Sequence, residues 1–240
     1  MPRTFVPALL APAMLALAAG HAAAELVIFS SDLDGQGRTP QFIRGLGSGV
    51  IGSGRCTLTL SDGPQGGFTQ QFEADFFADL DITPASSVEA GGVTVHTYHV
   101  SGTYGFRNAG TVDVLLSAEV SDANWVVLGT PDRWGSTGTV QGSSPFNQIA
   151  FTWGGPNVPE LGLAQGALFD DQEFTLGLDL VRTGVGLNPP NLGVALDDLH
   201  LPEQFWYSNV AFTGVANNVP APASLTLLGV GGLLASRRRR

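Results

Sequence analysis

Two carboxylates near the N-terminus have the spacing of a calcium ligand pair. The segment "SDLDGQGR" (31–38) places Asp32 and Asp34 two residues apart, directly before Gly35. Alternate carboxylates in a tight turn can converge on one hard cation. A complete EF-hand loop also needs a third ligand before the glycine and a glutamate near its end, and both are missing. A calcium site and an ordinary Asx-rich turn therefore both stay open, and the missing ligands favour the turn.

The histidines and the other acidic residues supply no recognisable catalytic set. His96 and His99 would lie on opposite faces of a strand, so they cannot bind one metal together. "DDLHL" places His200 beside acidic residues, but the sequence contains neither a G-x-S-x-G nor an H-E-x-x-H motif. Two carboxylates can hydrolyse a glycosidic bond, yet nothing selects a pair among 21 acidic residues. We therefore predict that the protein is not an enzyme.

Two tryptophans next to turn residues could bind a ligand. "TPDRWGSTG" and "FTWGGPN" hold Trp134 and Trp153, where exposed rings could stack on sugars of a polysaccharide. The alternative is that both rings cap the hydrophobic core, which is the commoner use of so large an apolar side chain. We favour the core and keep carbohydrate binding at these two residues as the second hypothesis.

Two other motifs are better explained by structure than by chemistry. "GSGVIG" (47–52) matches the G-x-G-x-x-G dinucleotide fingerprint, but a strand pattern follows it where that fingerprint requires a helix. A glycine-rich turn is the simpler interpretation in a chain with 32 glycines. Cys56 is the only cysteine, so no intrachain disulfide can form, and we interpret it as a small buried apolar residue on a strand.

The elements that would position these residues are strands. Apolar residues alternate with polar ones in "CTLTL" (56–60), "VTVHTYHV" (93–100) and "TVDVLLSAEV" (111–120), each bounded by turn residues. Only residues 158–171 could form two turns of helix, and two internal glycines argue against them. We predict one all-β domain over residues 25–215, a β-sandwich of the jelly-roll type.

The charges are strongly asymmetric. Between Glu25 and Glu203 the chain carries all 21 acidic residues, and six of its 11 arginines lie in the same region. It contains no lysine. Such an acidic surface repels the phosphates of nucleic acids and anionic lipids, so we predict no nucleic-acid partner.

The N-terminus has the order of parts found in a secretory signal. Arg3 precedes an apolar run from Phe5 to Ala19, and Ala22 and Ala24 satisfy the small-residue rule for signal peptidase cleavage before Glu25. A membrane anchor is the alternative, but the run is shorter than the roughly 20 residues that a spanning helix prefers. We predict that residues 1–24 are removed and that the protein is exported.

The last 25 residues, 216–240, form a linker and a tail of unusual composition. Val219, Pro220, Ala221 and Pro222 precede an apolar stretch, and the chain ends in Arg237, Arg238, Arg239 and Arg240. A helix over the apolar residues 224–236 reaches only roughly 20 Å, which makes a short anchor with the arginines on the cytoplasmic side. A plain anchor and a final strand are the alternatives, and four terminal arginines fit a sheet poorly.

This tail resembles the PEP-CTERM sorting signal of exported bacterial proteins. The resemblance covers about the last 22 residues, and Ala221 stands where the usual motif has glutamate. It implies an exosortase-like processing enzyme, transient attachment to the inner membrane and a lineage that makes extracellular polysaccharide. We therefore predict a structural or adhesive protein of the cell surface or biofilm matrix, with a carbohydrate- or calcium-binding module as the alternative and an uncharacterised hydrolase as the third possibility.

Overall fold

The structure is a computed structural model, and it describes residues 25–33, 41–63, 67–144, 146–184 and 191–218. In these residues the chain forms strands and one short 3-10 helix, η1 (Pro159–Leu161). The strands are β1 (Glu25–Leu33), β2 (Phe42–Leu46), β3 (Gly49–Ser61), β4 (Thr69–Ala90), β5 (Val93–Asn108), β6 (Val114–Thr130), β7 (Arg133–Ser143), β8 (Gln148–Trp153), β9 (Ala167–Thr183), β10 (Asn191–Leu192), β11 (Val194–Ala195) and β12 (Trp206–Asn218). The all-β prediction is confirmed.

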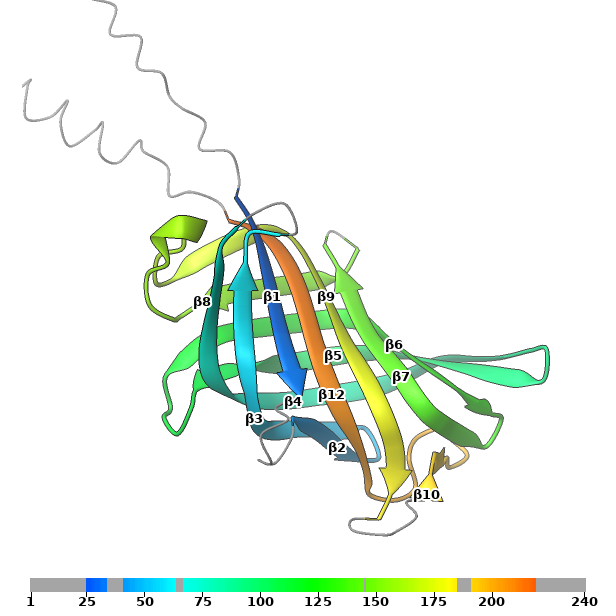
Figure 1. The fold of residues 1–240 in the computed structure, drawn as a ribbon. Coiled ribbons are helices and arrows are strands. Elements are labelled where there is room, and N and C mark those ends of the chain that lie inside the picture. Colours follow the sequence, from blue (N-terminus) through cyan, green and yellow to red (C-terminus); the bar gives the residue numbers. More distant parts are fainter. Residues whose placement is uncertain (1–24, 34–40, 64–66, 145, 185–190, 219–240) are drawn as a thin grey trace, which may run out of the picture.

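All the strands belong to one hydrogen-bonded sheet that closes on itself. Antiparallel pairing runs from β12 through β1, β3, β4 and β5 to β6, and returns through β7, β8 and β9 to β12. Figure 1 shows β3, β1, β12 and β9 in front and β4, β5 and β6 crossing behind them. The predicted sandwich of two sheets is therefore replaced by one continuous sheet, because long strands carry the hydrogen bonds from one layer into the other.

The core lies between these two layers and follows the alternation read from the sequence. Cys56, Leu58 and Leu60 on β3 are buried, and their neighbours on β3 are more exposed. Cys56 thus has the structural role predicted for it. Val112, which belongs to the alternating segment "TVDVLLSAEV" (111–120), lies before β6 and is 83% exposed.

Several glycines are needed because an aromatic ring lies against the strand. A Cβ atom on Gly52 would come within 2.5 Å of Cε1 of Phe76, and one on Gly142 within 2.7 Å of Cε1 of Phe174. Real Cβ atoms do not approach neighbours so closely, so these positions exclude any side chain. Part of the high glycine content is therefore a packing requirement of large aromatic residues.

The two ends of the described chain lie side by side. β1 begins at Glu25 and β12 ends at Asn218, and these two residues are direct partners in the sheet. Residues 216–218, which the sequence assigned to the linker, belong to β12. The predicted signal (1–24) and the sorting tail from Val219 lie outside the described residues.

The helix considered for residues 158–171 does not form. The segment contains the single turn of η1, followed by β9 from Ala167. Gly162 adopts φ 59° and ends the turn, which is the left-handed conformation that glycine accepts at a helix C-terminus. Among the described residues no helix is long and apolar enough to cross a membrane.

Candidate functional site

Two surface hollows flank the place where β6 changes its partner. Leu116 to Ser121 of β6 pair with β8, and Asn124 to Thr130 pair with β7. Asp122 lies at the change with φ 65°, a conformation that breaks the regular strand. The loop between β7 and β8 therefore stands above this fork, because it connects the two alternative partners.

Two hollows open on either side of this loop, and Asn147 lines both of them. The larger has a volume of about 640 Å³ and the smaller about 390 Å³. We call them together the fork groove. Their polar side chains come from β5, β6, β7, β8, β9 and the residues that join β7 to β8: Thr103, Glu119, Ser121, Asn124, Gln141, Ser143, Ser144, Asn147, Gln148, Glu173 and Thr175.

Asn147 fixes the shape of the loop. Its backbone N–H donates to the carbonyl oxygen of Ser143 (3.0 Å), and its side-chain Oδ1 accepts from the Ser143 N–H (3.1 Å). Its Nδ2 donates to the carbonyl oxygen of Asp122 at the fork. The Ser144 N–H adds a bond of 2.8 Å to the carbonyl oxygen of Gln172. The groove is therefore formed in advance of any ligand.

Gln172 bridges a stretch beneath the fork groove where the neighbouring strands β8 and β9 do not pair. β8 and β9 pair only at Thr152 and Trp153, so the backbone of Phe151 has no partner strand on that side. Oε1 of Gln172 accepts the Phe151 N–H, and Nε2 donates to the carbonyl oxygen of Phe169 (2.7 Å). Gln172 is 8% exposed. Its amide therefore replaces the missing hydrogen bonds between β8 and β9 at a site that water hardly reaches.

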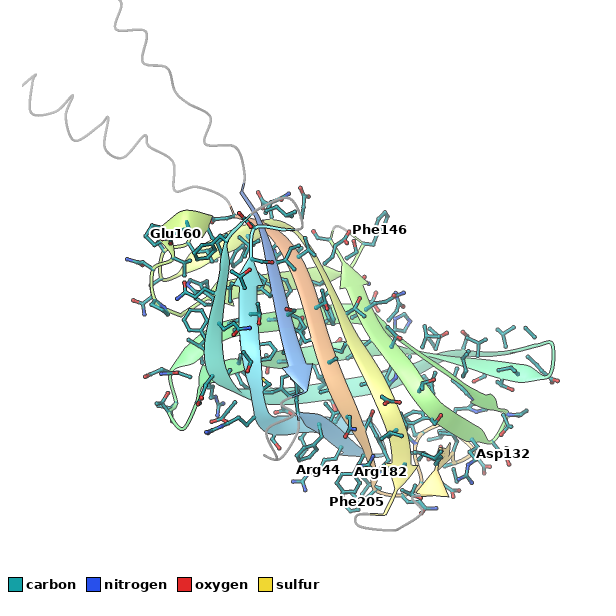
Figure 2. The ribbon with its side chains drawn as sticks, in the orientation of Figure 1. Arg44, Asp132, Phe146, Glu160, Arg182 and Phe205 are labelled. Carbon is teal, nitrogen blue, oxygen red and sulfur yellow. The ribbon has the colours of Figure 1, made fainter. Side chains whose placement is uncertain are left out.

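An aromatic ring stands beside the groove. Phe146 lines the smaller hollow and is 87% exposed. Figure 2 shows it on the loop between β7 and β8, directed away from the body, whereas Phe205 lies at the other end of the molecule. The smaller hollow contains the Glu173 carboxylate beside this ring, and the larger hollow contains the Glu119 carboxylate; both hollows also hold amides and hydroxyls. At its edge Nδ1 of His99 lies 2.5 Å from Oδ1 of Asp122.

The tryptophans proposed from the sequence are part of the core. Trp134 is 1% exposed and Trp153 0%, so neither ring has a face that a sugar could reach. Trp134 packs on Trp125 and Trp206 with ring centroids 5.2 and 5.4 Å away. The structure therefore places both residues as the core interpretation expects, because a closed sheet with two crossing layers needs large side chains to fill its interior.

The indole N–H groups of these two residues are also used inside the protein. Nε1 of Trp134 donates to the hydroxyl of Tyr98 (2.8 Å), which donates in turn to the carbonyl oxygen of His200 (2.7 Å). Burial raises the pKa of Tyr98 to about 12, although the bond from Trp134 acts in the opposite direction. Nε1 of Trp153 donates to the carbonyl oxygen of Pro156 (2.8 Å).

Of the two predicted calcium ligands, the structure describes only the backbone of Asp32. This backbone pairs with Thr57 near the end of β1, and Asp34 lies outside the described residues. Within residues 25–218 as described, no three His, Cys, Asp or Glu side chains are grouped closely enough to hold a metal ion. Calcium binding at Asp32 and Asp34 stays a prediction.

The histidines lie on opposite faces of β5, as the sequence indicated. His96 is buried, with Nδ1 2.9 Å from Oγ of Ser87 and Nε2 2.8 Å from the carbonyl oxygen of Thr130. A carbonyl can only accept, so Nε2 carries the proton and Nδ1 accepts from the serine hydroxyl. His99 points outward to Asp122. Both nitrogens of His96 are thus committed to structural bonds.

A third hollow, of about 600 Å³, lies over β3, β4 and β5 and carries a charge row. Nε of Arg55 donates to Oδ1 of Asp75 (2.8 Å), and the Arg107 guanidinium stands 4.5 Å from the ring centre of Phe77. The hydrogen bond from Arg55 holds the pKa of the Asp75 carboxyl below its ordinary value, although burial acts against it. Cross-strand pairing of this kind stabilises a sheet and does not by itself indicate a ligand.

No motif of the sequence indicates the fork groove. Its residues come from positions 102 to 175 and meet only because β6 pairs with both β7 and β8. One local signal was present: "SSPFNQ" places the apolar residue Phe146 among turn-forming residues, outside any alternating strand segment.

Comparisons with known proteins return no match: no family model, no curated protein and no solved structure is similar to the chain. Function is therefore argued from the residues and from the geometry of the sheet.

Proposed function

We propose that the chain is an exported bacterial protein of the cell surface or extracellular matrix, structural or adhesive and not catalytic. A PEP-CTERM-like tail would hold it briefly at the inner membrane before an exosortase-like enzyme releases it. The observation that carries this proposal is the pairing of Glu25 with Asn218 at the two ends of the described sheet.

The described sheet lies between the two processing sites expected from the sequence. Its first described residue, Glu25, follows the expected cleavage position at Ala24, and its last, Asn218, precedes Val219 and Pro220. Removal of residues 1–24 and of the tail would thus leave every described strand complete. A domain built in this way tolerates processing at both ends, because its terminal strands are held by their neighbours.

The geometry also suits a protein held by its tail. Both attachment points leave the sheet beside each other, so the opposite end with the β6–β7 and β2–β3 turns would face away from the membrane. The acidic surface favours solubility after release and gives no affinity for nucleic acid. Signal peptidase, the exosortase-like enzyme and extracellular polysaccharide are the partners that this route requires.

The test is the intact mass of the protein recovered from its own host, measured separately in membrane and medium. We expect the membrane form to begin at Glu25 and the released form to have lost the residues after roughly Val219. A released protein that still ends in Arg240 would contradict the sorting proposal. A chain that keeps residues 1–24 would contradict cleavage of the signal.

Two variants sharpen this test. Replacing Pro220 and Pro222 by alanine removes the motif and should leave the uncleaved form in the membrane. Ala221→Glu restores the usual residue between the prolines, and we expect release at least as efficient as that of the natural chain. Equal release of all three proteins would show that the prolines are not read by a processing enzyme.

A further inference from the structure

We propose that the fork groove is a binding site for a neutral polysaccharide, with Phe146 stacking on a sugar ring and the side chains of the two hollows bonding its hydroxyls. The inference rests on the proposed function, since it names the partner to which a surface or matrix protein would adhere. It moves the sugar site away from Trp134 and Trp153, whose rings are buried.

The chemistry of the lining fits hydroxyl groups. Each sugar hydroxyl donates one hydrogen bond and accepts others, so it needs partners of both kinds. Glu119 and Glu173 supply acceptors, and the amides of Gln141 and Gln148 supply donors and acceptors. Asn147, whose amide already makes its own bonds to the loop and the fork, holds the frame between the two hollows.

The exposed ring supplies the apolar part of the site. A pyranose presents C–H groups on its face, and an aromatic ring with its negative face attracts such groups and excludes water from them. Phe146 is 87% exposed and is followed by Asn147, which makes three hydrogen bonds to Ser143 and Asp122. The exposed area of the ring is thus available for such a contact.

The shape indicates a chain longer than a single sugar. The two hollows, of about 640 and 390 Å³, each have the size of an ordinary small-ligand site, and they adjoin at Asn147. They are open surface hollows lined by strands and a loop, as a site for a polymer must be, because the ends of the polymer have to leave the site.

The charge of the groove selects neutral sugars. Glu119 and Glu173 would repel uronate, sulfate or phosphate groups, and His99 at the edge is already paired with Asp122. The rest of the body is also acidic, so no general attraction would compensate for this repulsion. A neutral glucan, mannan or galactan avoids the penalty.

The experiment measures binding with protein expressed from the full 240-residue sequence. Neutral polysaccharides of different linkage (dextran, laminarin, galactomannan and arabinogalactan) are cast into native gels, with alginate as the anionic counterpart. A printed array of neutral oligosaccharides extends the same test. We expect the protein to migrate more slowly in gels that contain at least one of the neutral polysaccharides. In gels that contain alginate its migration should not be slowed. Binding to no neutral glycan on gels or array would overturn the proposal, and so would preferential binding to alginate.

Two variants locate the site. Phe146→Ala should weaken the binding about tenfold, because the stacking and the apolar area of one aromatic ring together raise the affinity by roughly that factor. Phe205→Ala is the matched control, since Phe205 is also exposed (60%) but lies at the other end of the molecule. Equal loss in both variants, or none in Phe146→Ala, would refute the assignment to the groove.

Two further measurements separate the possible causes of failure. Gln148→Ala removes one amide of the larger hollow and should also reduce binding, and circular dichroism reports whether each variant keeps its fold. The masses of the membrane and released forms do not depend on the groove. Loss of glycan binding with normal processing would therefore refute only this inference.

Discussion

Replacing Gln172 by leucine tests whether one side-chain amide closes the wall of the sheet. The amide makes two bonds, from the Phe151 N–H and to the carbonyl oxygen of Phe169, where β8 and β9 no longer pair. Leucine has a similar size but can make neither bond. The Phe151 N–H and the Phe169 carbonyl would then be buried without a partner.

The magnitude follows from the cost of such groups. Each buried polar group left unpaired costs about 1–3 kcal/mol, and the leucine side chain returns about 1 kcal/mol through its additional apolar area. We expect Gln172→Leu to lower the free energy of unfolding by about 1–5 kcal/mol. Urea denaturation followed by tryptophan fluorescence measures this change, because all four tryptophans are buried in the core.

Gln141→Leu is the matched control, because Gln141 is an exposed glutamine on the neighbouring strand β7. A surface substitution of this kind changes stability by about 0.5 kcal/mol or less. A loss below about 1 kcal/mol in Gln172→Leu, with an unchanged slope against urea, would refute the role assigned to its amide. It would indicate that water or a backbone shift satisfies the two groups.

Three other perturbations have expected outcomes. Burial raises the pKa of Tyr98 from 10 to about 12, so its stabilising effect is complete below the unfolded value and is lost as the pH rises through about 12; ultraviolet absorbance should record a late-titrating tyrosine with alkaline unfolding. Tyr98→Phe should lower stability at neutral pH, because the Trp134 N–H loses its acceptor, and should flatten the alkaline side of the stability curve. Arg55 lowers the pKa of Asp75 from 3.8, so the carboxylate contributes to folding stability above that value and this contribution is lost as the pH falls. Asp75→Asn should therefore flatten the acid side of the curve of stability against pH. Gly52→Ala should destabilise by about 1–3 kcal/mol through the close approach of its Cβ, whereas Gly49→Ala, with nothing nearer than 4.0 Å, should leave the thermal midpoint unchanged.

Local patterns in the sequence were enough to predict the class of fold. Alternation in "CTLTL" predicted that Cys56, Leu58 and Leu60 share one face, and the structure buries all three. A period of two depends only on the backbone of one strand, so it can be read without knowing its partners. The same holds for the opposite faces of His96 and His99.

The closure of the sheet could not be read in this way. The pairing of β12 with β1 joins residues almost 200 positions apart, β12 also pairs with β9, and no local pattern encodes either contact. The exposure of the tryptophans is decided by the same closure. "TPDRWGSTG" has the composition of a turn, yet the ring of Trp134 enters the interior beside Trp125 and Trp206.

The sequence by itself determined that the chain is all-β and acidic, and it supports an expected exported route through its two terminal segments. These properties depend on composition, short-range periodicity and the order of parts along the chain. Only the tertiary structure decided that the sheet is continuous, that Glu25 meets Asn218 and that Phe146 stands beside a polar groove. The reason is physical: a strand's faces are set by its own backbone, whereas a groove is set by which strands pair, and β6 changes its partner at Asp122.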